Sequence, residues 1–177
     1  MKIQIRQGVF ETNSSSVHTI SITCGVNAIP DSVRFSLGGE FGWSPEVHSD
    51  VHSKASYLYL AMVENLTNSD SKNFDEMLEG VNQYKEYVEE VLKAAGVKEI
   101  EWEELSLRGG SYGLYIDTPG YIDHGYELGN WLNDLRKPDL LLAFLFCENS
   151  AVYTGNDNCD EEPAGDPNSD YEYTKTN

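Results

Sequence analysis

The sequence predicts an α+β fold in which an N-terminal β-hairpin and a short mixed sheet pack on two longer helices, followed by an acidic, flexible C-terminal tail. Three patterns lead to this prediction: alternating apolar and polar residues near the N-terminus, apolar residues at spacings of three and four in the middle, and few apolar residues at the end. A chain of 177 residues, of which 40% are hydrophobic, can bury one core. We therefore expect a single α+β domain over residues 1–157 and an acidic tail over residues 158–177 that is flexible or is ordered by contacts with something else.

The N-terminal segment has the pattern of a β-hairpin. Apolar and polar residues alternate over Ile3–Val9 and again over Val17–Cys24, and the polar segment Glu11–Ser16 lies between them. Alternation with a period of two is typical of a strand with one buried face. A third strand is expected over Val33–Leu37, before a pair of glycines.

Two helices are expected in the middle of the chain. The segment Ser44–Glu46 offers an N-cap, a first-turn proline and a first-turn acid, and the apolar residues that follow predict a helix up to Leu66. The second helix follows Ser71 and ends at Gly96, because glycine readily adopts the left-handed conformation of a helix C-cap.

The last third of the domain mixes short strands and helices. Strands are expected over Glu99–Glu103, Tyr112–Asp117 and Ala151–Thr154, and a short helix over Tyr126–Leu135. The apolar run Asp139–Cys147 has no period and fits a buried helix or a buried strand. We favour the helix because Leu, Ala and Phe dominate and β-branched residues are absent.

Acidic residues give the chain a net charge of -18 and are gathered in two blocks. Asp75–Glu104 holds ten carboxylates and three lysines, and Glu148–Asn177 holds eight acids and one lysine. Such a field repels nucleic acids and anionic membranes and attracts basic surfaces. We therefore expect a basic protein surface as the partner, with no direct binding of nucleic acid or membrane.

The sequence also predicts a cytoplasmic protein. Its longest apolar run, Leu140–Cys147, is much shorter than the roughly 20 residues that span a bilayer, and residues 1–10 lack the apolar stretch of a signal peptide. The three cysteines are widely spaced and odd in number, which favours reduced thiols.

The second expected helix offers a candidate binding surface. Its acidic residues fall on the face opposite the apolar stripe, where a rise of about 1.5 Å per residue spaces them by roughly 6 to 10 Å. A row of carboxylates at such intervals can occupy a channel that binds a phosphate backbone. The residues that we expect to contact the partner, here and on the strand that follows, are Asp75, Glu79, Glu86, Glu90, Glu101, Glu103 and Glu104.

Two short segments resemble known sequences. Small uncharacterised proteins of bacterial phages and mobile elements contain segments similar to two parts of this chain. These parts are Phe10–His18 (FETNSSSVH), which Arg6–Val9 (RQGV) precedes, and Tyr153–Asp157 (YTGND). The resemblance implies a phage or mobile-element origin and expression in a bacterial host cell, and it brings no fold or activity with it. By analogy with acidic proteins from such sources, we expect an inhibitor of a nucleic-acid-processing defence enzyme, such as an anti-CRISPR protein.

An alternative hypothesis is a small hydrolase or transferase. Ser14–His18 places serines beside a histidine, and His124 with Asp157 would complete a nucleophilic site. However, the local signature of a serine hydrolase is absent, and Asn13–Ser16 has the composition of a turn held by side-chain hydrogen bonds. We therefore assign no catalytic residue.

A metal site is also considered and not assigned. His48 and His52 are four residues apart and would share a helical face, but Ser49 stands where a His-Glu-x-x-His motif has glutamate. Because two ligands do not make a site, we expect neither a metal nor another cofactor.

Overall fold

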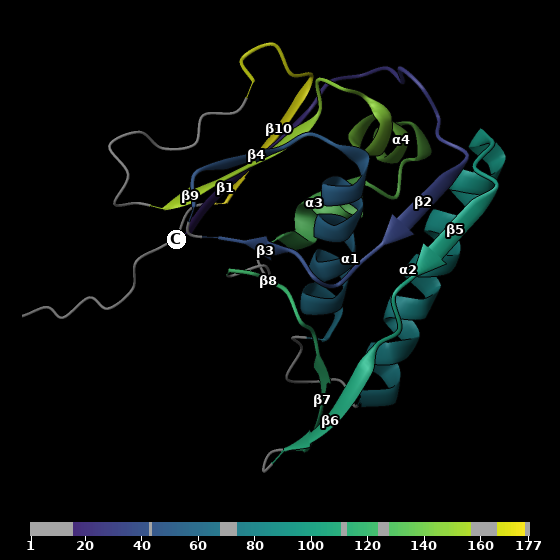
Figure 1. Ribbon diagram of the computed structural model, residues 1–177, viewed down its shortest axis with the longest axis vertical. Coiled ribbons are helices and arrows are strands. Elements are labelled where there is room, and N and C mark those ends of the chain that lie inside the picture. The colour runs from purple at the N-terminus through teal and green to yellow at the C-terminus, as the bar shows by residue number, and fades with distance from the viewer. Residues whose placement is uncertain are drawn as a thin grey trace, which may run out of the picture.

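The computed structural model describes residues 16–42, 44–67, 74–110, 113–123, 128–156 and 166–175. The protein has a mixed α+β fold, as predicted (Figure 1). Helix α1 (Val51–Thr67) runs through the middle of the molecule, with the largest described sheet on one side and α2 (Phe74–Ala95) on the other.

The largest described sheet is antiparallel and has the strand order β10-β1-β9-β4. Strand β1 (Ser16–Ile22) lies between β9 (Ala151–Asn156) and β10 (Tyr171–Lys175), and β4 (Glu46–His48) forms one edge. The strand expected over residues 3–9 lies outside the described residues. Residues 18–22 of β1 pair with β10, and residues 16–21 pair with β9.

Part of the expected flexible tail belongs to this sheet. Residues 171–175 form β10, and the Tyr173 hydroxyl donates a hydrogen bond to Asp134 at 2.9 Å. The backbone N–H of Asp170 also donates to the carbonyl of Ile22 at 3.0 Å. These residues follow the second of the two expectations for the tail, order imposed by another part of the protein, because polar composition does not prevent backbone pairing with an open strand edge.

Helix α1 begins later than the sequence pattern predicts. Residues 46–48 form strand β4, and the side chain of Val47 is 61% exposed instead of joining the helix stripe. Asp50 caps the helix, because its carboxylate accepts a hydrogen bond from the N–H of Ser53 at 2.9 Å. From residue 54 to residue 63 all side chains are buried, as expected for a helix in the centre of a core.

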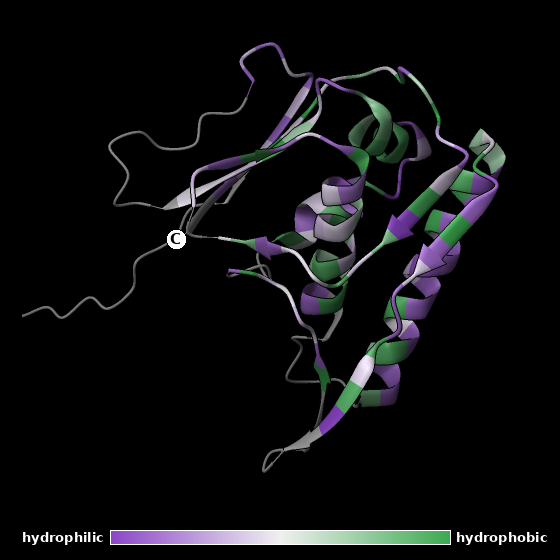
Figure 2. Ribbon diagram, viewed as in Figure 1, coloured by the Kyte–Doolittle hydropathy of each residue, from purple (hydrophilic) through white to green (hydrophobic). Residues whose placement is uncertain are grey.

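Helix α2 agrees with the prediction. Val81, Tyr84, Val88 and Leu92 are among its buried residues, and Gly96 ends it with a φ of 109°, where the N–H groups of Gly96 and Val97 bond to the carbonyl of Leu92. Figure 2 shows polar and apolar residues alternating along this helix, whereas α4 (Pro138–Phe146) is almost entirely apolar.

Three pairs of short strands complete the described β-structure. The parallel pairs are β2 (Ser32–Phe35) with β5 (Glu99–Trp102) and β3 (Glu40–Phe41) with β8 (Tyr121–Ile122), and the antiparallel pair is β6 (Ser106–Gly110) with β7 (Gly113–Asp117). The strands expected near residues 33, 100, 113 and 151 are confirmed.

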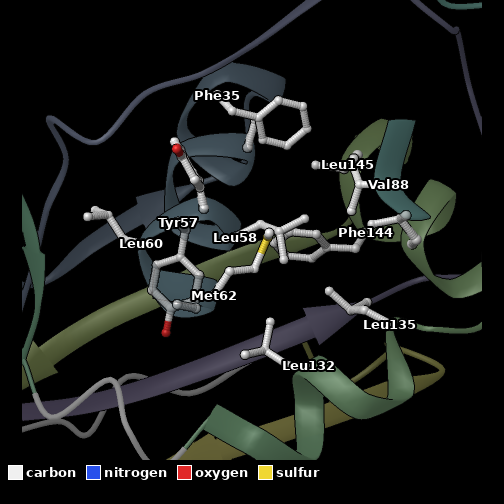
Figure 3. Close-up of a cluster of buried hydrophobic side chains, with 14 of the residues drawn as sticks. Phe35, Tyr57, Leu58, Leu60, Met62, Val88, Leu132, Leu135, Phe144 and Leu145 are labelled. Carbon is white, nitrogen blue, oxygen red and sulfur yellow. The ribbon is translucent and has the colours of Figure 1, made fainter. Parts of the chain in front are cut away.

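Two short helices close the core. Helix α3 (Gly129–Asp134) matches the predicted short helix, and α4 (Pro138–Phe146) confirms the helical interpretation of the apolar run, with Pro138 in its first turn. Figure 3 shows side chains from α1, α2, α3, α4 and β2 in one cluster, including Phe35, Leu58, Val88, Leu132 and Phe144.

Candidate functional site

The outer face of α2 carries an exposed row of carboxylates. Asp75, Glu79, Glu86 and Glu90 are all exposed, and they project from the side of the helix opposite its buried residues. Within the described residues none of the four forms an ion pair with Lys or Arg, although Glu79 accepts a hydrogen bond from Gln83 at 2.8 Å. We call these four residues the α2 stripe.

The opposite face fixes the position of the α2 stripe. The hydroxyl groups of Tyr84 and Tyr87 donate to the carbonyls of Leu132 and Leu135 at 2.7 and 3.1 Å. The guanidinium of Arg136 lies 4.8 Å from the centre of the Tyr84 ring. Two hydrogen bonds and a cation–π contact thus tie α2 to α3 and the turn after it.

The side of α2 that faces β5 holds cations. Trp102 donates to Glu89 at 3.0 Å, and the Lys85 ammonium lies 4.9 Å from the Trp102 ring. The hydrogen bond from Lys93, at 2.6 Å, holds the pKa of the Glu89 carboxyl below its usual value. Glu89 is therefore committed to contacts within the protein and does not extend the α2 stripe.

The remaining predicted site residues lie on and after β5 and do not share one environment. Glu101 is exposed and stands opposite Arg34 in the register of β2 and β5. Glu103 is half-buried and accepts hydrogen bonds from the Ser36 hydroxyl and the Leu37 N–H at 2.8 and 2.9 Å. Glu104 is exposed in the loop that follows. The structure thus brings four of the seven predicted carboxylates together on α2.

The residues of the alternative enzyme hypothesis are only partly described. Ser14, Ser15, His124 and Asp157 lie outside the described residues. His18 lies on β1 and is fully buried, with Nδ1 3.1 Å from the hydroxyl of Tyr57. This contact identifies His18 as a member of the core.

A polar cleft lies between β3, β4, β8 and the start of α1. It consists of two cavities of about 330 and 260 Å³ that share Glu40 and Glu46 as lining residues, and we call it the Glu40–Glu46 cleft. The larger cavity is also lined by His48 and His52, and the smaller one by Tyr121. The sequence does not predict that Glu40 and Tyr121 lie in one cleft, because β3 and β8 are two residues long and 80 residues apart.

The histidines of this cleft come from different elements. His48 is in β4 and His52 is in the first turn of α1, so they do not share a helical face. The Nε2 atom of His48 lies 3.7 Å from the Glu46 carboxylate, and the imidazole ring meets the ring of Phe41 edge-on at 4.8 Å. Burial is the main cause that lowers the pKa of His48 below its usual 6.5. In the described part of the chain, His, Cys, Asp and Glu side chains form no group of three or more suited to a metal ion.

Among the described residues, no helix combines the length and the apolar character needed to cross a membrane. The chain matches no protein-family model, and no curated protein or solved structure shows significant similarity to it.

Proposed function

We propose that this protein is a phage-encoded acidic inhibitor that uses the α2 stripe to bind a basic protein surface. The observation that carries this proposal is the row of four exposed carboxylates on one face of a 22-residue helix. The target we propose is the nucleic-acid channel of a defence enzyme, as in anti-CRISPR proteins.

The geometry of the α2 stripe supports a charge-driven interaction. Its carboxylates are separated by roughly 6 to 10 Å along the helix axis. Lys and Arg side chains that contact phosphates respond to charge and position and carry little sequence information. A regular row of anions therefore competes for the same side chains.

The rigidity of α2 also supports binding. Its inner face is buried in the core, and Tyr84 and Tyr87 are hydrogen-bonded to the backbone around α3. A surface that is already in its binding conformation loses little entropy on association. The net charge of -18 adds long-range attraction to a basic partner and increases the association rate.

The proposed origin rests on the resemblance of the FETNSSS and YTGND segments to phage and mobile-element proteins. Expression in a bacterial host would bring the protein into contact with enzymes that cut or bind foreign nucleic acid. These enzymes carry basic channels, which are the surfaces that an acidic stripe recognises.

Charge reversal on α2 tests this proposal. We expect Glu86→Lys with Glu90→Lys to leave the fold intact, because both side chains are exposed and Lys and Glu have similar helix propensities. Binding to a partner captured from a bacterial lysate at low salt should weaken at least tenfold, chiefly through slower association. The measurement is association and dissociation kinetics at two salt concentrations.

Glu99→Lys with Glu172→Lys is the matched control, because it changes the net charge equally at two exposed positions on strands away from the α2 stripe. It should slow association only slightly. Equal losses in both variants would mean that net charge and not the α2 stripe determines binding. An unchanged affinity in the α2 variant would rule out this helix as the interface.

A further inference from the structure

We propose that the Glu40–Glu46 cleft is a binding site for one organic cation, the guanidinium or ammonium group of a small molecule or of a basic side chain. This site is separate from the α2 stripe and does not rest on the proposed function. Figure 1 shows β3, β4 and β8 on one side of α1 and α2 on the other.

The charge of the cleft favours a cation. Glu40 and Glu46 are both exposed and line both cavities, so both carboxylates contribute negative charge to the same cleft. Neither Lys nor Arg is among the described residues that line it. Beside the part of the lining that the structure describes, a bound cation would therefore be the first full positive charge.

His48 leaves the charge of Glu46 uncancelled near neutral pH. Its Nε2 atom is 3.7 Å from the Glu46 carboxylate, which is beyond hydrogen-bond distance. The half-buried ring packs edge-on against Phe41, and its desolvation favours the neutral imidazole. Glu46 is therefore available to a ligand.

Aromatic rings and glycines shape the cleft for a flat or compact cation. Tyr121 is 43% exposed and lines the smaller cavity, where a cation can lie against the face of its ring. Gly38, Gly39 and Gly42 line the two cavities without side chains that would fill them. A Cβ at Gly39 would collide with the ring of Phe41, which also lines the larger cavity, so glycine is favoured at this position.

An anion fits the cleft less well. The first turn of α1 borders the larger cavity through His52 and Ser53, and a free helix N-terminus would attract an anion. However, the N–H of Ser53 already donates to Asp50, whose charge also offsets the helix dipole. Together with the two glutamates, this leaves the cleft negative.

Titration with N-acetyl-arginine methylamide, followed by amide chemical shifts, tests the site. We expect saturable shifts at Gly38, Gly39 and Tyr121, and much smaller shifts with the citrulline analogue, which has nearly the same shape and no charge. The lysine analogue distinguishes a guanidinium site from a general cation site. A short arginine peptide distinguishes a protein ligand, which should bind more tightly, from a free small molecule.

The variant for this site is Glu40→Gln with Glu46→Gln, and the control is Glu99→Gln with Glu172→Gln, which removes the same charge from exposed positions outside both the cleft and the α2 stripe. The cleft variant should bind the arginine analogue at least tenfold more weakly, and the control should bind it like the parent. If the cleft variant does not fold, Tyr121→Leu replaces it, with an expected loss of severalfold. Three results would overturn the proposal. They are equal binding of the arginine and citrulline analogues, amide chemical-shift changes outside the cleft, and equal losses of affinity in the cleft and control variants. The two proposals can fail separately. If the Glu86→Lys with Glu90→Lys variant loses a protein partner and the cleft variant does not, the cleft proposal is unaffected.

Discussion

The ammonium nitrogen of Lys54 lies 2.8 Å from the carbonyl oxygen of Cys147, deep inside the protein. It also donates to the carbonyl of Ser150 at 3.0 Å, and the Lys54 side chain is 1% exposed. Helix α1 is thereby tied to the end of α4 and to the loop before β9. Burial lowers the pKa of Lys54 from 10.5 to about 8.

This lysine makes stability depend on pH. Because the pKa is lower in the folded protein, the unfolded chain binds more protons between about pH 8 and 10.5. The free energy of unfolding should therefore rise with pH above 8, by at most about 1.4 kcal/mol per pH unit. Neutral Lys54 retains two N–H donors, so both hydrogen bonds can persist.

Urea unfolding between pH 7.5 and 9.5 measures this effect. Lys54→Met should be less stable than the parent at every pH, because the carbonyls of Cys147 and Ser150 lose their donor, and its stability should no longer rise with pH. A parent and a variant with the same pH slope would contradict the assignment. Above pH 10, ionisation of tyrosines such as Tyr59, whose pKa burial raises to about 12, acts in the opposite direction.

Glu103 should contribute to stability through its hydrogen bonds. Replacing it with alanine leaves the Leu37 N–H and the Ser36 hydroxyl without their acceptor, and we expect a loss of about 1–3 kcal/mol at pH 7. Glu104→Ala is the matched control at the next position, which is exposed, and it should change stability by less than about 0.5 kcal/mol.

The contribution of Glu103 should also disappear in acid. Its bonds to Leu37 and Ser36 lower the carboxyl pKa below 4.5, so the stabilisation is present above this value and is lost as pH falls through the folded pKa. The difference between parent and Glu103→Ala in denaturant unfolding should therefore shrink at low pH. A difference that stays constant down to pH 2.5 would show that the charged carboxylate is not the acceptor.

Gly120 should tolerate no side chain. Its added Cβ would collide with the carbonyl oxygen of Gly39 and would lie 2.5 Å from the carbonyl oxygen of Leu37. These two oxygens accept hydrogen bonds from the N–H groups of Tyr121 and Gly120, so they cannot easily move away. We expect Gly120→Ala to lower the free energy of unfolding by about 1–3 kcal/mol or more. Gly80→Ala on α2 is the control, because no atom lies within 4 Å of its added Cβ, and it should raise stability by about 0.5–1 kcal/mol.

Strand β10 should be needed for full stability. Removing residues 166–177 deletes the ladder to β1 and the bond from Tyr173 to Asp134. We expect a clear fall in the midpoint of thermal unfolding, whereas Tyr173→Phe, which removes one partly buried hydrogen bond, should cost about 1 kcal/mol. A truncated protein with the parent's midpoint would mean that this segment does not contribute to the stable sheet.

Local sequence signals found the elements whose pattern is complete within one segment. The period of α2 is visible over six turns, and Gly96 marks its end by a conformation that other residues rarely adopt. Similarly, Pro138 and the Leu- and Phe-rich run identified α4. The exposure of the α2 stripe follows from the same period, since a helix that buries one face exposes the opposite one.

The sequence pattern does not predict the structure of short segments that form strands by pairing with a distant part of the chain. The signals at Ser44–Glu46 are those of a helix start, but residues 46–48 pair with β9, which lies about 100 residues further along the chain. The polar composition of residues 171–175 does not predict a strand, and these residues form β10 because they pair with β1. Backbone pairing carries little side-chain signature at a sheet edge, so composition could not reveal either strand.

By itself, the sequence determined the α+β class, the two long helices and the acidic character of the molecule, because helical period and net charge are properties of contiguous residues. Only the tertiary structure decided that Glu103 is held by Ser36 and Leu37, and that Glu40 and Glu46 share a cleft with Tyr121. These relationships join segments far apart in the chain. They depend on which strand edges and cavities remain open after the core has packed, and no local pattern specifies this.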